Sequence, residues 1–261
     1  MILMLGDIHG NWNKLINTIK SKKISDCAII QVGDFGVGYR TEYNELIHLK
    51  NLDKELHDKN IIMYCIRGNH DDKNYFNGGY IFDNLKLMSD YSVLKIEEYN
   101  FLFVGGAVSI DRKYNLSKMQ LAASLGLNSP SYWYDEVFNL DKDKLANIKD
   151  IDIVVTHTCP QWCPPDNTKG FGSLVMSFAK KDSELLSDLK CERDMLTEMF
   201  NILISNGNKI KKHYYGHFHR SQVSYYGDTQ HILLDIDEFQ LIDKYYKDNY
   251  IENAYVGSQL F

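Results

Sequence analysis

The sequence predicts an α/β fold whose functional side chains lie at the carboxyl ends of its strands. Near the amino terminus, apolar runs of strand length alternate with glycine-containing polar loops and with helical patterns. Parallel strands joined in this way place their carboxyl ends at one edge of a sheet. Of the 261 residues, 44% are hydrophobic and 25% are charged, so the chain can bury a large core, as ordinary globular proteins do.

Residue patterns define the first three strands and the first two helices. Apolar runs predict strands at Ile2–Leu5, Ala28–Val32 and Ile61–Ile66. Helical spacing of apolar residues predicts one helix from Asn11 to about Lys20 and another over Glu42–Asp58. A Gly-Asp loop follows each of the first two strands, and the sequence GNHDD follows the third.

The rest of the chain is expected to add a hairpin, two helices and further strands. The stretch YSVLKIEEYNFLFVGGAV, residues 91–108, predicts a hairpin that turns near Asn100. The later elements are a helix at Ser117–Leu125, a buried strand at Ile151–Thr156, a long helix at Ser183–Ser205, and strands at His213–Tyr215, Gln222–Tyr226, His231–Ile236 and Gln240–Tyr245.

A single domain over residues 1–261 is expected. The sequence has no internal repeat, no low-complexity segment and no Pro/Gly-rich linker. The stretch from about residue 111 to residue 150 is less regular, and we expect it to form a flap over the site.

Five polar clusters stand at the ends of predicted strands. In Gly216-His217-Phe218-His219, two imidazoles lie one residue apart, directly after a glycine. An isolated pair of this kind is usually two surface histidines, so its meaning depends on partners elsewhere. The other clusters are GDIHG at 6–10, Gly33-Asp34, GNHD at 68–71, and His157 after the IDIVVT strand. All of them carry carboxylate, imidazole or amide groups, which are metal-ligand side chains.

This order of motifs resembles the calcineurin-like metallophosphoesterase superfamily, whose blocks run GDxHG, GDxx, GNHD/E, a strand-terminal His, and GHxH. All five blocks are present between Asp7 and His219, which is most of the chain. The resemblance implies a sandwich of two mixed β-sheets flanked by helices. It also implies a hydrolase of phosphoric esters with two divalent metal ions at the strand ends.

The resemblance also implies roles for individual residues. One metal ion would be held by Asp7, His9 and His219. The other would be held by Asn69, His157 and His217, with Asp34 bridging both ions. His70 would be the catalytic histidine that assists the leaving group.

The residue types suit phosphoryl chemistry. Mixed nitrogen and oxygen ligands without thiolate favour Mn²⁺, with Fe or Zn²⁺ also compatible. Two such cations about 3.5–4 Å apart can clamp a phosphoryl group and activate a bridging water. The neutral amide of Asn69 leaves positive charge for the phosphate. A protonated His70 could donate to the departing alkoxide.

The second motif departs from the pattern of the superfamily's protein Ser/Thr phosphatases. Those enzymes continue it as GDxVDRG, whereas Val37 and Gly38 stand here in place of the Asp and the Arg. This weakens a phosphoprotein phosphatase or a diadenosine tetraphosphate hydrolase as an interpretation. We expect phosphodiesters, nucleotide-derived or cyclic, to be favoured. A phosphomonoesterase acting on protein or small molecules, or a non-catalytic scaffold, is the alternative.

The sequence offers three candidates for substrate contacts, namely Arg40, Asp111 and Arg112. The competing interpretation of the last two is a surface ion pair. Arg67, just before GNHD, is expected to be a structural ion-pair residue. The loop tryptophans Trp133 and Trp162 are expected to pack rather than stack on a base, and His48, His57, His213 and His231 are not expected to be ligands.

Charge and cysteine usage limit the partners and the compartment. The net charge of −6 and the pI near 5.8 argue against extended duplex nucleic acid as a partner. A phosphate-ester substrate is compatible, because metal ions supply positive charge locally. The expected location is cytoplasmic, without signal peptide or membrane span, and with reduced thiols at Cys27 and Cys65. Cys159 and Cys163 have three residues between them rather than the two typical of a zinc knuckle, which speaks against a thiolate site.

Overall fold

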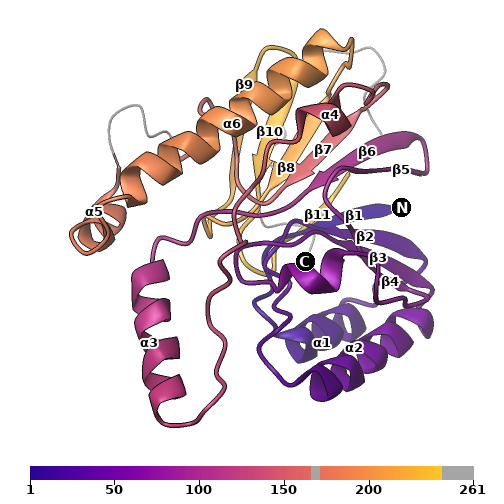
Figure 1. The fold of residues 1–261 in the computed structure, drawn as a ribbon. Coiled ribbons are helices and arrows are strands. Elements are labelled where there is room, and N and C mark those ends of the chain that lie inside the picture. Colours follow the sequence, from indigo (N-terminus) through magenta and orange to yellow (C-terminus); the bar gives the residue numbers. More distant parts are fainter. Residues whose placement is uncertain (166–170, 243–261) are drawn as a thin grey trace.

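In the computed structural model, which describes residues 1–165 and 171–242, two mixed sheets pack face to face between layers of helices (Figure 1). The first sheet has the order β11-β1-β2-β3-β4. Its parallel strands are β1 (Ile2–Leu5), β2 (Cys27–Gln31), β3 (Ile61–Cys65) and β4 (Leu85–Leu87), and β11 (Phe239–Leu241) pairs antiparallel with β1.

The second sheet has the order β5-β6-β7-β8-β10-β9. Its four central strands, which are parallel, are β6 (Tyr99–Val104), β7 (Ile153–Thr156), β8 (Lys212–Tyr215) and β10 (Thr229–Leu233). Antiparallel strands β5 (Ser92–Ile96) and β9 (Gln222–Tyr226) form the two edges. The α/β sandwich of two mixed sheets flanked by helices is therefore confirmed.

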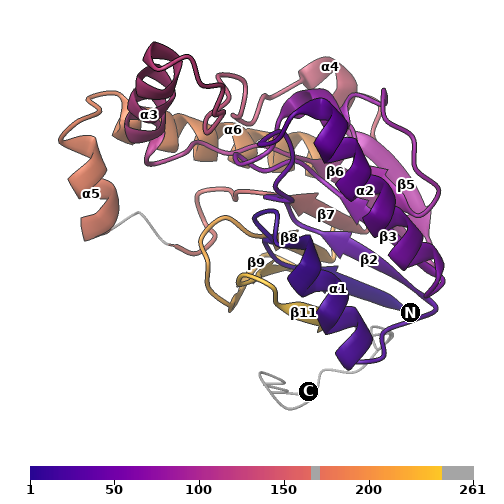
Figure 2. The same ribbon diagram turned by 90° about the horizontal axis from the view of Figure 1, so that it is seen from below.

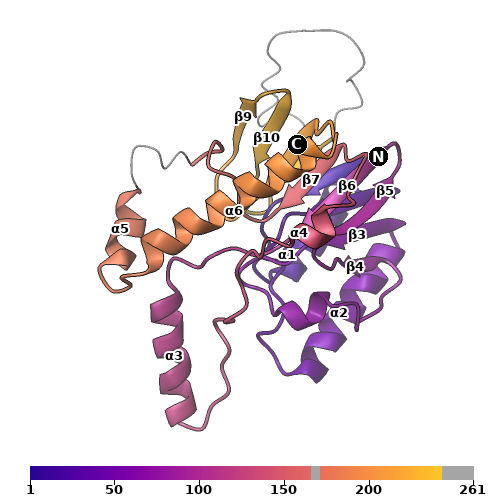
Figure 3. The ribbon, with the colours of Figure 1, turned by 45° about the horizontal axis from the view of Figure 1, so that its top comes forward.

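Helices cover the outer faces of both sheets. Figure 2 shows α1 (Trp12–Ser21) and α2 (Glu42–His57) on the first sheet. The second sheet is covered by α6 (Leu185–Ser205) and the short α4 (Lys142–Leu145). Helices α3 (Arg112–Ser124) and α5 (Ser173–Ala179) project on the side where the parallel strands end (Figure 3), and a 3₁₀ turn spans Lys73–Phe76.

The core has one apolar layer between the sheets and one beneath each set of helices. Between the sheets, alternate residues of facing strands meet, among them Met4, Phe103 and Val155. Leucines at helical spacing in α2 pack against the first sheet, and α6 packs its own leucines and Phe200 on the second. Thr41 caps α2 by accepting the backbone N–H of Asn44.

Some predicted boundaries were wrong. The hairpin turns at residues 97–98 rather than at Asn100, because Ile96 pairs with Tyr99. Helix α3 begins at Arg112, five residues before the expected Ser117, and its only buried residue is Asn115, so apolar spacing gives little sign of its start. The last predicted strand extends beyond residue 242 and so lies partly outside the described residues.

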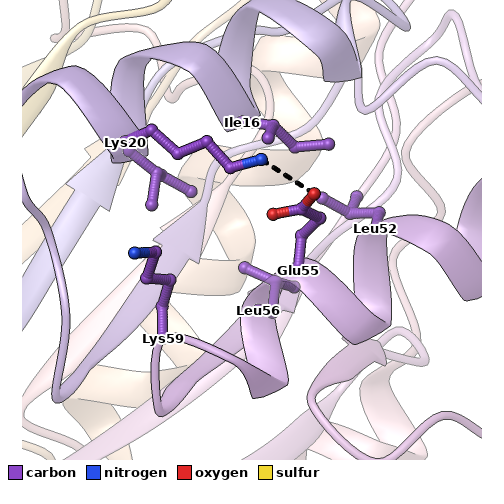
Figure 4. A pocket seen from close by; sticks show the side chains of 7 residues that line it. Ile16, Lys20, Leu52, Glu55, Leu56 and Lys59 are labelled. Atoms are coloured by element: carbon purple, nitrogen blue, oxygen red, sulfur yellow. Dashed lines mark hydrogen bonds and ion pairs between the residues drawn. The ribbon is translucent and has the colours of Figure 1, made fainter.

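A small hollow lies in the seam between α1 and α2 (Figure 4). Ile16, Leu52 and Leu56 line it, and the Lys20 ammonium meets the Glu55 carboxylate at 2.8 Å across it. Its lining contains no predicted site residue. No helix in the described ranges 1–165 and 171–242 is long and apolar enough to cross a membrane.

Candidate active site

All seven predicted ligand residues lie in loops that directly follow β1, β2, β3, β7 and β8, at one edge of the sandwich. They form two groups that share Asp34. The ligand atoms within each group lie within 4.8 Å of one another. The first group is Asp7, His9, Asp34 and His219, and the second is Asp34, His157 and His217, with Asn69 beside His157.

Short distances define the centre of the cluster. The Nε2 atoms of His9 and His219 are 3.0 Å apart, and Nε2 of His219 is 3.4 Å from Oδ2 of Asp7. Nε2 of His157 lies 3.1 Å from Oδ1 of Asp34. Asp7, Asp34 and His157 are buried, whereas His9 and His219 are exposed, so one end of the cluster faces solvent.

The backbone is strained at this cluster. Four of the ligand residues have left-handed φ angles, namely His9 (50°), Asp34 (55°), His217 (70°) and His219 (49°). Side-chain-bearing residues seldom adopt this conformation, which costs about 1–3 kcal/mol each and is frequent at functional sites.

Two glycines let the loops approach this closely. A Cβ atom at Gly216 would lie 2.0 Å from Oδ1 of Asp7, and a Cβ atom at Gly68 would lie 2.1 Å from Oδ1 of Asp34. Any larger residue would displace a carboxylate of the cluster. The glycines of the GHFH and GNHD motifs are therefore required by the packing of the predicted ligand residues.

The donor set fits a cation. His157 donates its Nδ1 proton to the carbonyl of Val32 at 2.8 Å, which leaves the lone pair of Nε2 facing the cluster. Asn69 donates its amide to Ser109, so its Oδ1 atom points at this same Nε2, 3.1 Å away. Two acceptors face each other there beside the Asp34 carboxylate, and only a metal ion or a proton between them removes the repulsion.

The pKa shifts of His157 and Asp34 also indicate that a positive charge is favoured at this position. Burial alone would lower the pKa of His157, but the adjacent Asp34 carboxylate outweighs burial and raises this pKa to about 10. The pKa of Asp34 lies well below its ordinary value, because the attraction of His157 outweighs the penalty of burial. A cation that bound between these groups would displace a proton shared by them.

A buried hydrogen-bonded chain orients Asn69, and the sequence analysis missed it. The Asn69 amide donates to Ser109 Oγ at 2.8 Å, and the Ser109 hydroxyl donates to the Glu136 carboxylate at 2.7 Å. The backbone N–H of Ser109 donates to the same carboxylate. Burial raises the pKa of Glu136 to about 8. Glu136 belongs to the predicted flap, so this segment supports Asn69, a predicted ligand residue.

Replacing Ser109 with Ala should weaken metal binding without removing a ligand. Outer partners of metal ligands typically contribute about 10–100-fold in affinity, and we expect the Mn²⁺ concentration needed for half-saturation to rise by this factor. Ser124→Ala, which removes an exposed serine that bonds within α3, should have no effect. An unchanged Mn²⁺ requirement in Ser109→Ala would show that Asn69 needs no such support.

Tyr39 contacts His70, the predicted catalytic histidine. Its hydroxyl lies 3.0 Å from Nδ1 of His70. The ring of Trp133 meets Tyr39 edge-on at 4.9 Å and holds it in place, so Trp133 packs as expected. Burial raises the pKa of Tyr39, so the phenol remains protonated. The sequence analysis missed this contact, because Tyr39 lies two residues beyond Val37, the position at which the motif comparison was made.

Tyr39→Phe should reduce turnover moderately. A hydrogen bond contributes about 0.5–1.5 kcal/mol, which corresponds to a loss in kcat of about 2–10-fold. The loss should be larger for substrates with poor leaving groups, since Tyr39 acts through His70. Tyr43→Phe, at an exposed tyrosine of α2, is the matched control. Equal losses on good and poor leaving groups would remove Tyr39 from this role.

The last residue of GNHD shapes the loop that carries Asp34. The buried carboxylate of Asp71 accepts the backbone N–H groups of Phe35, Gly36, Val37 and Gly68. Burial raises its pKa to about 6. The two loops after β2 and β3 are thereby fixed to each other. The motif contains this residue, but its spacing alone does not show which loop it binds.

The three candidate substrate residues do not form a cluster as the predicted ligand residues do. Arg40 donates to Glu45 at 2.8 Å and lies over the Trp12 ring. Arg112 is paired with Asp182 and Asp188 at 2.5 and 2.7 Å, and Asp111 precedes α3. Arg67 is buried and bonds to Asp90 and to carbonyls of residues 135–137, which is the structural role expected of it. Trp162 stacks on Tyr226.

A sandwich of two mixed sheets, with carboxylate, imidazole and amide groups gathered at the strand ends, is the architecture of the metallophosphoesterases. A family model described as calcineurin-like phosphoesterase matches residues 1–221. The chain belongs to this family and is a hydrolase of phosphoric esters.

Similar solved structures are distant. A phosphopantetheinyl hydrolase from Mycobacterium tuberculosis is 14% identical over 95% of this chain and 98% of that one, with a TM-score of 0.46. GAP50 of Plasmodium, an anchor in the inner membrane complex, is 16% identical over 90% and 70%, with a TM-score of 0.40. An archaeal phosphodiesterase is 14% identical over 90% and 83%, with a TM-score of 0.33. No curated protein matches the chain by sequence.

Proposed function

We propose that the chain hydrolyses phosphodiesters at a binuclear site formed by the seven strand-end residues. The observation that supports this most is the division of these residues into two groups that share Asp34. A carboxylate common to both groups offsets the repulsion between two cations. Mn²⁺ is the proposed ion, with Fe or Zn²⁺ as alternatives, because the donors are nitrogen and oxygen.

The bound ions would supply Lewis acidity and a water molecule activated at neutral pH. The chain's own residues do the rest. Asp34 is held in register by the backbone N–H of His70, which donates to its Oδ1 at 2.9 Å. Asn69 and His157 are fixed by Ser109 and by the carbonyl of Val32. These contacts position the ligands before substrate arrives, which is how a rigid site lowers the cost of reaching the transition state.

His70 is the proposed acid for the leaving group. Its Nδ1 atom is engaged by Tyr39, so Nε2 is the nitrogen left to donate a proton to the departing oxygen. Its ring lies 5.4 Å from that of His9, at the solvent-facing end of the cluster. A positioned proton donor accelerates departure of a poor leaving group by about 10²–10⁴-fold.

The preference for diesters rests on charge. Arg40 and Arg112, the two arginines considered for substrate contacts, are each paired with carboxylates of the chain. A monoester dianion would need a cationic side chain beside the metals, whereas a diester carries a single charge. Nucleotide-derived and cyclic phosphates are the proposed substrates, and phosphomonoesters are the second candidate.

Hydrolysis of bis-(nitrophenyl) phosphate and of nitrophenyl phosphate, each with Mn²⁺, tests the proposal. We expect both to be hydrolysed and the diester to have the higher kcat/KM. A higher kcat/KM for the monoester would overturn the diester preference. No turnover of either ester by metal-loaded protein would favour a non-catalytic scaffold.

The expectations on compartment and domain organisation stay proposals. We propose a cytoplasmic protein, which the free thiols of all five cysteines support. We also propose that residues 1–261 form one domain, with the segment from about 111 to 150 as its flap. The contacts of Trp133 and Glu136 with the site loops support this part of the proposal.

A further inference from the structure

A second group of metal-ligand side chains lies on the outer face of the second sheet. Strands β8 and β10 are parallel neighbours, and their register places His213 directly beside His231. The next residues, Tyr214 and Ile232, point into the core between the sheets, so both imidazoles point the other way. Both histidines are buried, and Phe200 of α6 packs on His213 at 4.9 Å.

The loop after β7 brings two sulfur atoms to the same place. Cys159 and Cys163 are fully buried, and their thiols contact each other. Arg193 of α6 fixes this loop by donating to carbonyl oxygens of Pro160, Cys163 and Pro165. The loop is therefore held in one conformation by a buried guanidinium.

The ligand atoms of Cys163, His213 and His231 lie within 4.8 Å of one another. The Nδ1 atoms of the two histidines are only 2.9 Å apart. His213 is oriented by Thr156, whose hydroxyl donates to the carbonyl of Thr158 and so accepts from Nε2 of His213 at 2.7 Å. The lone pair of the His213 Nδ1 atom therefore points into the cluster, which is the arrangement of a metal-bound histidine.

We propose that Cys163, His213 and His231 bind a structural zinc ion. Cys159, whose thiol contacts that of Cys163 and donates to the carbonyl of Pro164 at 3.5 Å without the ion, turns to become the fourth ligand. Two thiolates and two neutral imidazoles are a common set for closed tetrahedral zinc sites. They cancel the charge of Zn²⁺, which a buried site requires. Binding releases the two thiol protons to solvent. The three residues between the cysteines fall within the spacing of about two to four that such sites use, so the sequence-based objection to this site is not decisive.

Without an ion, the same atoms form a hydrogen-bonded chain. The Nδ1 proton of His231 then bonds to Nδ1 of His213, and Nε2 of His231 accepts from the Trp162 indole at 3.3 Å. Zinc binding moves the ring proton of His231 to Nε2, so the long contact with Trp162 is given up. This hydrogen-bonded arrangement is the alternative to the zinc site. The two arrangements differ in whether the cysteine sulfur atoms bind a metal ion.

Cobalt substitution distinguishes them. The seven-residue phosphoesterase site contains no sulfur ligand, so a thiolate-to-Co²⁺ charge-transfer band in the near ultraviolet reports the cysteine cluster alone. We expect the band in Co²⁺-loaded wild-type protein, its loss in Cys163→Ser, and its retention in Cys191→Ser, which changes an exposed cysteine. We also expect Asp34→Asn to keep the band and one zinc ion per chain.

Absence of the band from the wild-type protein would overturn the proposal in favour of the hydrogen-bonded chain. A band that persists in Cys163→Ser would overturn the assignment of the ligands. Because the wild-type spectrum decides the first point, a variant that fails to fold does not leave the question open. Activity on phosphate esters plays no part in this readout, so failure of this proposal and failure of the phosphoesterase proposal are distinguishable.

Discussion

Asp34→Asn should abolish most of the phosphoesterase activity and empty the binuclear site. Asp34 is the one residue common to both ligand groups, and it is almost completely buried. An amide lacks the negative charge that offsets two cations. Metal ions stabilise the transition state by several kcal/mol, so their loss corresponds to a decrease in kcat/KM of about 10³-fold or more.

The measurements are elemental analysis, kcat/KM and thermal unfolding of the same preparations. The Asp34→Asn variant should contain two fewer metal ions per chain than the wild-type protein. Its Tm should be lower, because ligands that bind only the folded state stabilise that state. Asp228→Asn, at an exposed aspartate of the β9–β10 turn, is the matched control. If Asp34→Asn kept both ions and full activity, the bridging assignment would be wrong.

The positions of the strand-end residues could be predicted because local sequence determines them. Asp7, Asp34 and His157 each follow a buried apolar strand within three residues, and neighbouring parallel strands bring such positions together. Glycines beside four of the five motifs, all except His157, indicated close approaches, as Gly68 and Gly216 show. The sandwich of two mixed sheets was expected from the family resemblance rather than from residue periodicity, and the strand order was not predicted.

The supporting residues could not be predicted, because they come from distant parts of the chain. Ser109 and Glu136 reach Asn69 from loops that no motif connects to it. Tyr39 contacts both His70 and Trp133, which belongs to the segment after α3. These contacts depend on the conformation of the loops over the sheet edge, and the patterns in a single sequence do not determine that conformation. The role proposed for His213 and His231 was likewise not expected, because both lie in ordinary strand patterns.

His70→Asn should slow hydrolysis of a diester with an alkyl leaving group by about 10²–10⁴-fold, the usual contribution of a positioned general acid. The loss should be much smaller for a nitrophenyl diester, because nitrophenolate departs without a proton. Asparagine preserves the backbone N–H that donates to Asp34, so the metal site should remain loaded. Metal content measured on the same sample checks this directly.

The leaving-group dependence separates proton donation from simple disruption of the site. A variant with a distorted metal cluster loses activity on both diesters to the same degree, since both need the activated water. His57→Asn, on the exposed side of α2, should change neither rate. Tyr39→Phe should reproduce the leaving-group dependence of His70→Asn at smaller amplitude, because it acts only on the orientation of that ring. Comparable losses on alkyl and nitrophenyl diesters in His70→Asn would exclude the general-acid role, and the proton would then have to come from solvent at the open end of the cluster.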